Sequence, residues 1–185
     1  MNRRDALKTI GVMLGTALTP SLAQAMEAGY VTPAAGEPLR AFTPPQSELV
    51  ATLAELIIPA TDTPGARAAR VDAFIDGLLV DIFPYEERQR FLVGLADVDE
   101  RARAATGKPF LSNAPEKRLA LLSALEEESR HAPPGSQPFF PWLKELTLTG
   151  YYTSEIGASQ ELKYVHIAGY YDGDVPYAQV GRAYS

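Results

Sequence analysis

The stretch that decides the fold is Val71-Asp72-Ala73-Phe74-Ile75-Asp76-Gly77-Leu78-Leu79-Val80-Asp81-Ile82. Its large apolar residues recur at i, i+3, i+4, i+7, i+8 and i+11, which is the spacing of one face of an α-helix. An apolar stripe of this kind is stable only when another element covers it. The stretch therefore predicts a core helix, and the rest of the chain has to supply its cover.

Weaker helical patterns flank this stretch on both sides. Before it, Thr43 and Pro44 have the form of an N-cap followed by proline at the first helical position, and an apolar repeat then continues to Pro59. After it come three further repeats, over 84–106, over 113–132 and from about 141. Asn113 with Glu116 three residues later predicts a capping box at the start of the second of these. No stretch alternates long enough to predict a sheet, so we expect an all-α domain of four or five helices.

The composition limits the kinds of protein that the chain can be. Its 185 residues include 17 Lys plus Arg, 23 Asp plus Glu, 46% apolar residues and no cysteine, with a net charge of −6. These values are typical of one globular domain, and the acidic balance argues against a nucleic-acid partner. The lack of cysteine excludes disulfides, Cys-ligated zinc, iron–sulfur clusters and thiol nucleophiles. The only histidines, His131 and His166, are too few for a three-histidine metal site.

The first twenty-five residues have the pattern of an export signal. A basic start is followed by an apolar or small-residue run from Thr9 to Leu22, and Ala23-Gln24-Ala25 ends it. A basic start, a short apolar run and an A-x-A site are the three parts of a secretory signal, and the run falls short of the roughly 20 residues needed to span a bilayer. We therefore expect cleavage near Ala25 and a periplasmic protein.

The basic start favours the twin-arginine export route. Arg3 and Arg4 are followed by Leu7 and Lys8, in the spacing of the consensus R-R-x-F-L-K, with Ala6 where phenylalanine is usual. A Sec signal with two chance arginines is the alternative. The mildly apolar run supports the twin-arginine interpretation of residues 1–25.

Two segments outside the signal lack helical periodicity. Residues 26–45 are rich in proline and predict an extended arm, whose order would need a partner surface. Residues 46–185 are expected to form a single helical domain, and after Gly150 it carries seven of the nine tyrosines in an irregular, glycine-rich tail. Tyrosine is enriched where proteins grip partners, although some rings could instead close over the domain's own core. The candidate partner-interface residues are Trp142, Tyr151, Tyr152, Tyr164, Tyr170, Tyr171, Tyr177 and Tyr184.

No stretch predicts catalytic, cofactor-binding or metal-binding residues. Asp172-Gly173-Asp174 is similar to the start of a calcium loop, but Ala183 stands where an EF-hand needs glutamate, which favours a simple turn. His131 follows a helix and His166 lies among apolar and aromatic residues, so a structural role is preferred for both. G-x-S-x-G, G-x-G-x-x-G and P-loop motifs are all lacking.

Two longer elements carry a resemblance to a known family. The first is I-P-A-T-D-T-P-G-A, at residues 58–66, and the second is T-G-Y-Y-T-S-E-I-G, at residues 149–157. Together with the signal and with Val71 and Phe74-Ile75-Asp76, they resemble the gluconate 2-dehydrogenase subunit 3 family. The resemblance covers most of the chain after the signal.

The resemblance implies the non-catalytic small subunit of a membrane-associated periplasmic dehydrogenase that oxidises gluconate, glucose, fructose or a related sugar. In such complexes a large glucose-methanol-choline flavoprotein holds FAD and oxidises the substrate, and a multihaem cytochrome c subunit with haem c passes the electrons on. The small subunit would assist folding of the flavoprotein and lend it the twin-arginine signal, so the twin-arginine translocase is a further implied partner. The alternatives are a free-standing exported hydrolase using His166 with Asp172 or Glu155, and a ligand-binding helical module.

Overall fold

The computed structural model describes residues 19–133, 136, 138–162 and 176, and this part of the chain is all-helical. No strand occurs among these residues, and none of their helices is both long and apolar enough to cross a membrane. The all-α prediction is confirmed, and the described residues form six α-helices where four or five were expected, α2 being the one not expected. The elements are α2 (Pro20–Glu27), α3 (Pro44–Ile57), α4 (Val71–Asp81), α5 (Tyr85–Thr106), α6 (Pro115–Arg130) and α7 (Phe139–Tyr152), with a 3-10 helix η1 (Phe110–Ser112) and a π-helical turn η2 (Gly157–Glu161).

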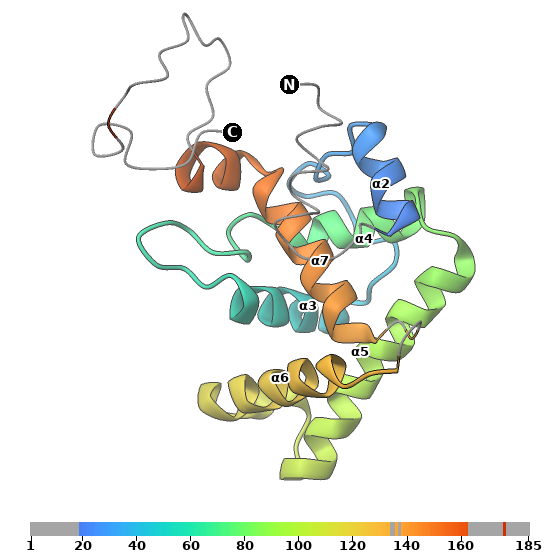
Figure 1. Ribbon diagram of the computed structural model, residues 1–185, viewed down its shortest axis with the longest axis vertical. Coiled ribbons are helices and arrows are strands. Elements are labelled where there is room, and N and C mark those ends of the chain that lie inside the picture. The colour runs from blue at the N-terminus through green and yellow to red at the C-terminus, as the bar shows by residue number, and fades with distance from the viewer. Residues whose placement is uncertain (1–18, 134–135, 137, 163–175, 177–185) are drawn as a thin grey trace, which may run out of the picture.

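Helix α4 is the core helix that its apolar repeat predicts. Phe74, Ile75, Leu78 and Leu79 are fully buried. Helices α3 and α7 pack on α4 and on each other, and Figure 1 shows these three crossing beside one another, with α6 and the far end of α5 at one end of the molecule. A Cβ at Gly150 of α7 would lie only 2.7 Å from Cδ1 of Phe74. Glycine therefore allows the close approach of α7 to α4.

A buried carboxylate holds the segment between α2 and α3 on α4. Asp76 is 3% exposed, and its two oxygens accept three consecutive backbone N–H groups, from Arg40 at 2.8 Å, Ala41 at 2.9 Å and Phe42 at 2.8 Å. The guanidinium of Arg40 also makes two hydrogen bonds to Asp81, of 2.7 and 2.6 Å, and holds the pKa of that carboxyl below its usual value. The surface that orders the proline-rich segment is thus the chain's own helix α4.

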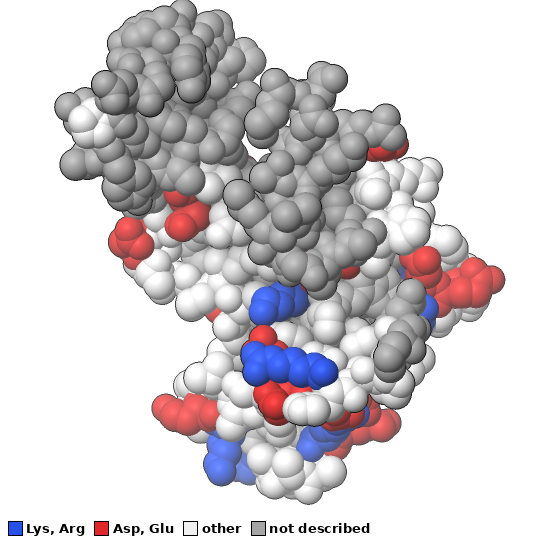
Figure 2. All heavy atoms as spheres, viewed as in Figure 1, with Lys and Arg blue, Asp and Glu red and all other residues white. Residues whose placement is uncertain are grey.

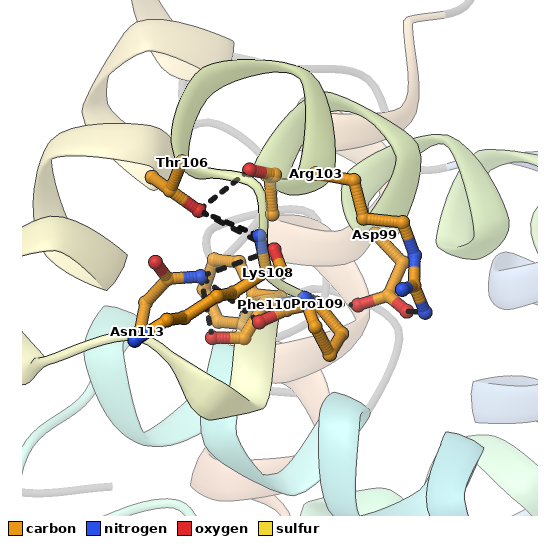
Figure 3. Close-up of polar contacts among 8 residues, drawn as sticks. Asp99, Arg103, Thr106, Lys108, Pro109, Phe110 and Asn113 are labelled. Atoms are coloured by element: carbon orange, nitrogen blue, oxygen red, sulfur yellow. Dashed lines mark hydrogen bonds and ion pairs between the residues drawn. The ribbon is translucent and has the colours of Figure 1, made fainter.

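The turn between α5 and α6 shows that the capping box predicted at Asn113 is wrong. Asn113 donates its side-chain amide to the carbonyl of Pro109 at 2.9 Å, while Asp99 accepts the backbone N–H of Phe110 at 2.8 Å (Figure 3). Helix α6 has Ala114 at its N-cap and proline at its first position. Because proline suits that first position, the helix starts one residue later than a cap at Asn113 would require.

Helix α2 crosses the boundary that the signal pattern places at residue 25. Leu22 and Ala25 are fully buried in the hydrophobic core. Just before the helix, the backbone N–H of Thr19 donates to Oε1 of Glu145 on α7, at 2.8 Å. Burial raises the pKa of Glu145, and the hydrogen bond from Thr19 partly opposes this shift.

We predict that Asp76→Ala lowers the free energy of unfolding by about 3 kcal/mol or more, because three backbone donors lose a charged acceptor. Asp81→Ala is the matched control on the same helix. Its ion pair with Arg40 has side chains 39% and 38% exposed, and exposed pairs contribute about 0–1 kcal/mol. Urea unfolding followed by circular dichroism measures both variants. Equal losses for the two would contradict the anchoring role of Asp76.

Glu145 predicts a pH dependence of stability. Since its pKa is higher in the folded than in the unfolded chain, its contribution to stability is complete below the unfolded pKa and declines as pH rises through the folded pKa. Glu145→Gln keeps an oxygen acceptor for Thr19 without the acid. We expect this variant to gain stability relative to the wild type as pH rises from about 4 to about 8, measured by urea unfolding. A difference between the two proteins that does not change with pH would contradict the burial of an ionisable group.

Candidate functional site

The two sequence elements that carry the resemblance meet in space. We call residues 58–66 together with residues 149–161 the motif junction. The hydroxyl of Tyr151, a residue only 1% exposed, donates to the carbonyl oxygen of Pro64 at 2.8 Å. The hydroxyl of Thr63 donates to Oε2 of Glu161 in η2 at 2.6 Å. Helix α7 and η2 thereby fix the loop that follows α3.

A carboxylate in the last turn of α3 shapes the loop from the other side. Oε1 of Glu55 accepts the backbone N–H of Ala60 at 2.9 Å, and Oε2 accepts that of Arg67 at 2.9 Å. Gly65 lies against this carboxylate, so that a Cβ on Gly65 would be 2.5 Å from Oε1. The glycine in the T-P-G-A part of the motif is therefore required for the loop to close over Glu55.

The T-S-E-x-G part of the second element turns the chain at the end of α7. The hydroxyl of Ser154 donates to the carbonyl of Tyr151 at 2.6 Å and accepts the backbone N–H of Gly157 at 3.0 Å. A side chain at Gly157 would collide with the carbonyl oxygen of Tyr151. Ser154 and Gly157 thus shape a tight turn.

Among the candidate interface residues, Trp142 and Tyr151 lie inside the subunit. The Trp142 ring is 7% exposed and packs on Phe83 and Phe91, with ring centroids 5.7 and 5.3 Å apart. Tyr152 is half-buried against Tyr151, and burial raises its pKa. For Trp142 and Tyr151 the structure thus agrees with the alternative that some rings pack over the domain's own core. The remaining candidates, Tyr164, Tyr170, Tyr171, Tyr177 and Tyr184, lie outside the described residues, and their interface role stays a prediction.

The structure does not assemble a catalytic set from the residues that it describes. His131 is 75% exposed at the end of α6, with Nδ1 2.9 Å from the carbonyl oxygen of Glu127. Glu155 is exposed, and its proposed hydrolase partners, His166 and Asp172, lie outside the described residues. Within the described ranges, no group of three or more His, Asp or Glu side chains is placed to bind a metal ion. Of the predicted export residues, Ala23 and Ala25 lie in α2, and the described ranges do not include Arg3, Arg4, Leu7 and Lys8.

Charged side chains gather at the end of the molecule formed by α5 and α6, where the two signs are interspersed (Figure 2). Arg101 of α5 pairs with Asp97 at 2.6 Å and with Glu128 of α6 at 2.5 Å. Lys144 of α7 pairs with Glu126 of α6 at 3.2 Å. Because each of these positive side chains lies next to a negative one, the charges at this end largely cancel. The surface there does not present an electrostatic potential of one sign.

Sequence reasoning gave no role to Glu55, which opens the longer stretch 55–66 that carries the resemblance, or to Glu161, which follows the second element. Glu55 and Glu161 each hold part of the loop, but nothing in their spacing distinguishes them from solvated acids. The available signal was local: Glu55 lies in the last helical turn before a proline- and glycine-rich loop, where a carboxylate can accept loop N–H groups.

We predict that Tyr151→Phe lowers the free energy of unfolding by about 1 kcal/mol, because a buried hydrogen bond across the motif junction is lost. Tyr85→Phe is the matched control, since Tyr85 is 63% exposed. Thermal unfolding of both variants, with proteolysis of the 58–66 loop as a second measurement, tests this. If the control loses as much stability as Tyr151→Phe, the hydrogen bond to Pro64 does not hold the junction.

Comparison with known proteins identifies the family of the chain. The family described as gluconate 2-dehydrogenase subunit 3 matches residues 44–169, well over half of the chain. No curated protein and no solved structure matches the sequence of this chain. The matched range begins with α3 and includes both elements of the motif junction. The chain therefore belongs to the gluconate 2-dehydrogenase subunit 3 family.

Proposed function

We propose that the chain is a non-catalytic accessory subunit of a periplasmic FAD-dependent dehydrogenase for a sugar or sugar acid. In this proposal it escorts the large flavoprotein subunit through the twin-arginine translocase. Membership of the family supports a place in a dehydrogenase complex. The paired arginines Arg3 and Arg4, with Lys8 after them, support the export route.

One observation carries the accessory role: the polar side chains that shape the motif junction bond to the backbone of the chain itself. Tyr151 and Ser154 each donate to a backbone carbonyl, and both oxygens of Glu55 accept backbone N–H groups. A general acid, base or nucleophile has to be within reach of a substrate atom. Groups held in this way shape a rigid surface, which suits a subunit that supports another protein.

The escort role follows from the chemistry of the implied partner. A flavoprotein needs FAD for its hydride chemistry, and the twin-arginine route exports proteins that are already folded around such a cofactor. A small subunit that carries the signal gives the loaded flavoprotein access to that route. FAD would lie in the flavoprotein, and haem c in a multihaem cytochrome subunit at the inner membrane.

We propose the tyrosine-rich tail as the contact with the flavoprotein. Of the eight aromatic candidates, Trp142 and Tyr151 are buried in the core, and Tyr152 is half-buried. The five tyrosines from Tyr164 to Tyr184 lie outside the described residues and are the ones proposed for this contact. Aromatic anchors of this type typically lose about 2 kcal/mol or more of binding free energy when truncated.

The export proposal is tested by replacing Arg3 and Arg4 with lysine and co-expressing the flavoprotein. We expect periplasmic flavoprotein to fall at least about tenfold, because lysine keeps the charge but not the guanidinium pair that defines the signal. The measurement is flavin content and immunoblotting of the periplasmic fraction.

Lys117→Arg, which also exchanges one cation for another but lies at an exposed position outside the signal, is the matched control and should leave export unchanged. If the double lysine variant exports normal amounts of FAD-loaded flavoprotein, the escort proposal is wrong.

A further inference from the structure

The peptide bond that the signal pattern marks for cleavage lies inside a folded helix. The A-x-A site, Ala23-Gln24-Ala25, belongs to α2, and the side chain of Ala25 is fully buried. The carbonyl oxygen of Ala25, at the bond that would be cut, accepts the backbone N–H of Tyr30 at 3.0 Å. Residues on both sides of the bond are therefore held in one hydrogen-bonded element.

Helix α2 has complete boundaries of its own. Thr19 is its N-cap and Pro20 its first residue. At the other end Gly29 has a φ of +70°, and its N–H donates to the carbonyl of Met26 at 3.1 Å, while the N–H of Tyr30 reaches Ala25. These two bonds with a left-handed glycine form a Schellman motif. The boundaries enclose the cleavage site instead of exposing it.

Contacts with three other helices hold α2 on the domain. The hydroxyl of Ser21 donates to Oε2 of Glu87 on α5 at 2.8 Å, and the backbone N–H of Thr19 donates to Glu145 on α7. The ring of Tyr30 meets that of Phe74 on α4 edge to face, with centroids 5.6 Å apart. The position of α2 beside α4 is visible in Figure 1.

Removal of these residues would damage the folded domain. Cleavage after Ala25 takes away Leu22, which is fully buried in the core. It also takes away Thr19, the donor to the buried carboxylate of Glu145, and Ser21, the donor to Glu87. A buried carboxylate without its donor is unfavourable. The folded state thus depends on residues that an export signal normally discards.

A peptidase that recognises A-x-A has to take the small side chains of Ala23 and Ala25 into its own site. In the folded chain Ala25 is already packed in the core and its carbonyl is engaged by Tyr30. Cleavage can then proceed only from a state in which α2 has opened, so its rate follows the population of that state.

We infer that the folded subunit masks its own processing site and keeps residues 1–25 after export. The inference rests on the proposed function in one respect, since the twin-arginine route delivers the chain to the peptidase already folded. Packing of α2 in the folded domain and cleavage after Ala25 then exclude each other. The leader stays covalently attached to the subunit in the assembled complex.

The first test is the intact mass of the subunit in the complex purified from the periplasmic face of the membrane. We expect the mass of the chain with its leader. A chain that starts at Met26 would overturn the inference. A chain that starts at Met26 although its export requires Arg3 and Arg4 counts against masking alone. If export does not require the arginine pair, the export proposal has failed, and the next test decides on masking, because there the subunit is folded before the peptidase is added.

The second test separates masking by the fold from a poor cleavage sequence. Purified leader peptidase is added to the full-length subunit and to a fusion of residues 1–28 to an unrelated reporter. We expect the folded subunit to be cut at least about tenfold more slowly than the fusion, because only its open state is a substrate. Resistance of the fusion as well would overturn masking by the fold.

Variants locate the mask in the contacts of α2. Leu22→Ala leaves Ala23-Gln24-Ala25 intact but removes a buried side chain, and should speed cleavage of the subunit. Glu87→Ala, which removes only the acceptor of Ser21, keeps the test valid if the first variant fails to fold. Glu86→Ala, at an exposed position next to Glu87 on α5, is the matched control and should leave cleavage unchanged. Unchanged cleavage in Glu87→Ala and in a folded Leu22→Ala would overturn the inference.

Discussion

The carboxylate of Asp76 is the constraint on which the N-terminal half of the structure depends. It is buried on α4 and accepts three consecutive N–H groups, from Arg40, Ala41 and Phe42. A buried charge of this kind is tolerated only with such donors, so the chain before α3 has to lie against α4. That segment leads back to Tyr30 and to α2. One acid in the central helix thus links the core to residues that would otherwise belong to a leader.

The five helices from α3 to α7 could be predicted because each has an apolar repeat, although the boundary signal read at Asn113 for α6 was wrong. Thr43 and Pro44 start α3 as predicted, and Gly107 ends α5 with a φ of +75°. Helix α2 could not be assigned in the same way, because its small and apolar residues suit an export signal equally well. Thr19 and Gly29 bound α2 in the structure, but the same sequence is also compatible with an export signal. Only the contacts of this segment with α4, α5 and α7 show that it is a helix of the folded domain.

The candidate site was predictable in its parts and not in its assembly. The resemblance identified residues 58–66 and 149–157, yet what joins them is contact across the fold, such as the hydrogen bond from the Tyr151 hydroxyl to the carbonyl of Pro64, 87 positions away in sequence. No local periodicity encodes such a contact. Composition also could not predict where the aromatic residues lie. A large aromatic ring is equally suited to a core and to an interface, so the sequence did not show whether Trp142 and Tyr151 are buried in the domain or contact a partner.

The segment before α3 is part of the folded domain, and amide hydrogen exchange of residues 40–42 in the native full-length chain tests this most directly. If Asp76 holds these N–H groups, they should exchange as slowly as the buried amides of α4, since both open only when the domain unfolds. Exchange of all three near the rate of an unstructured peptide, with α4 still protected, would contradict the account. The segment would then be a loose linker, and the attachment of α2 would not depend on Asp76.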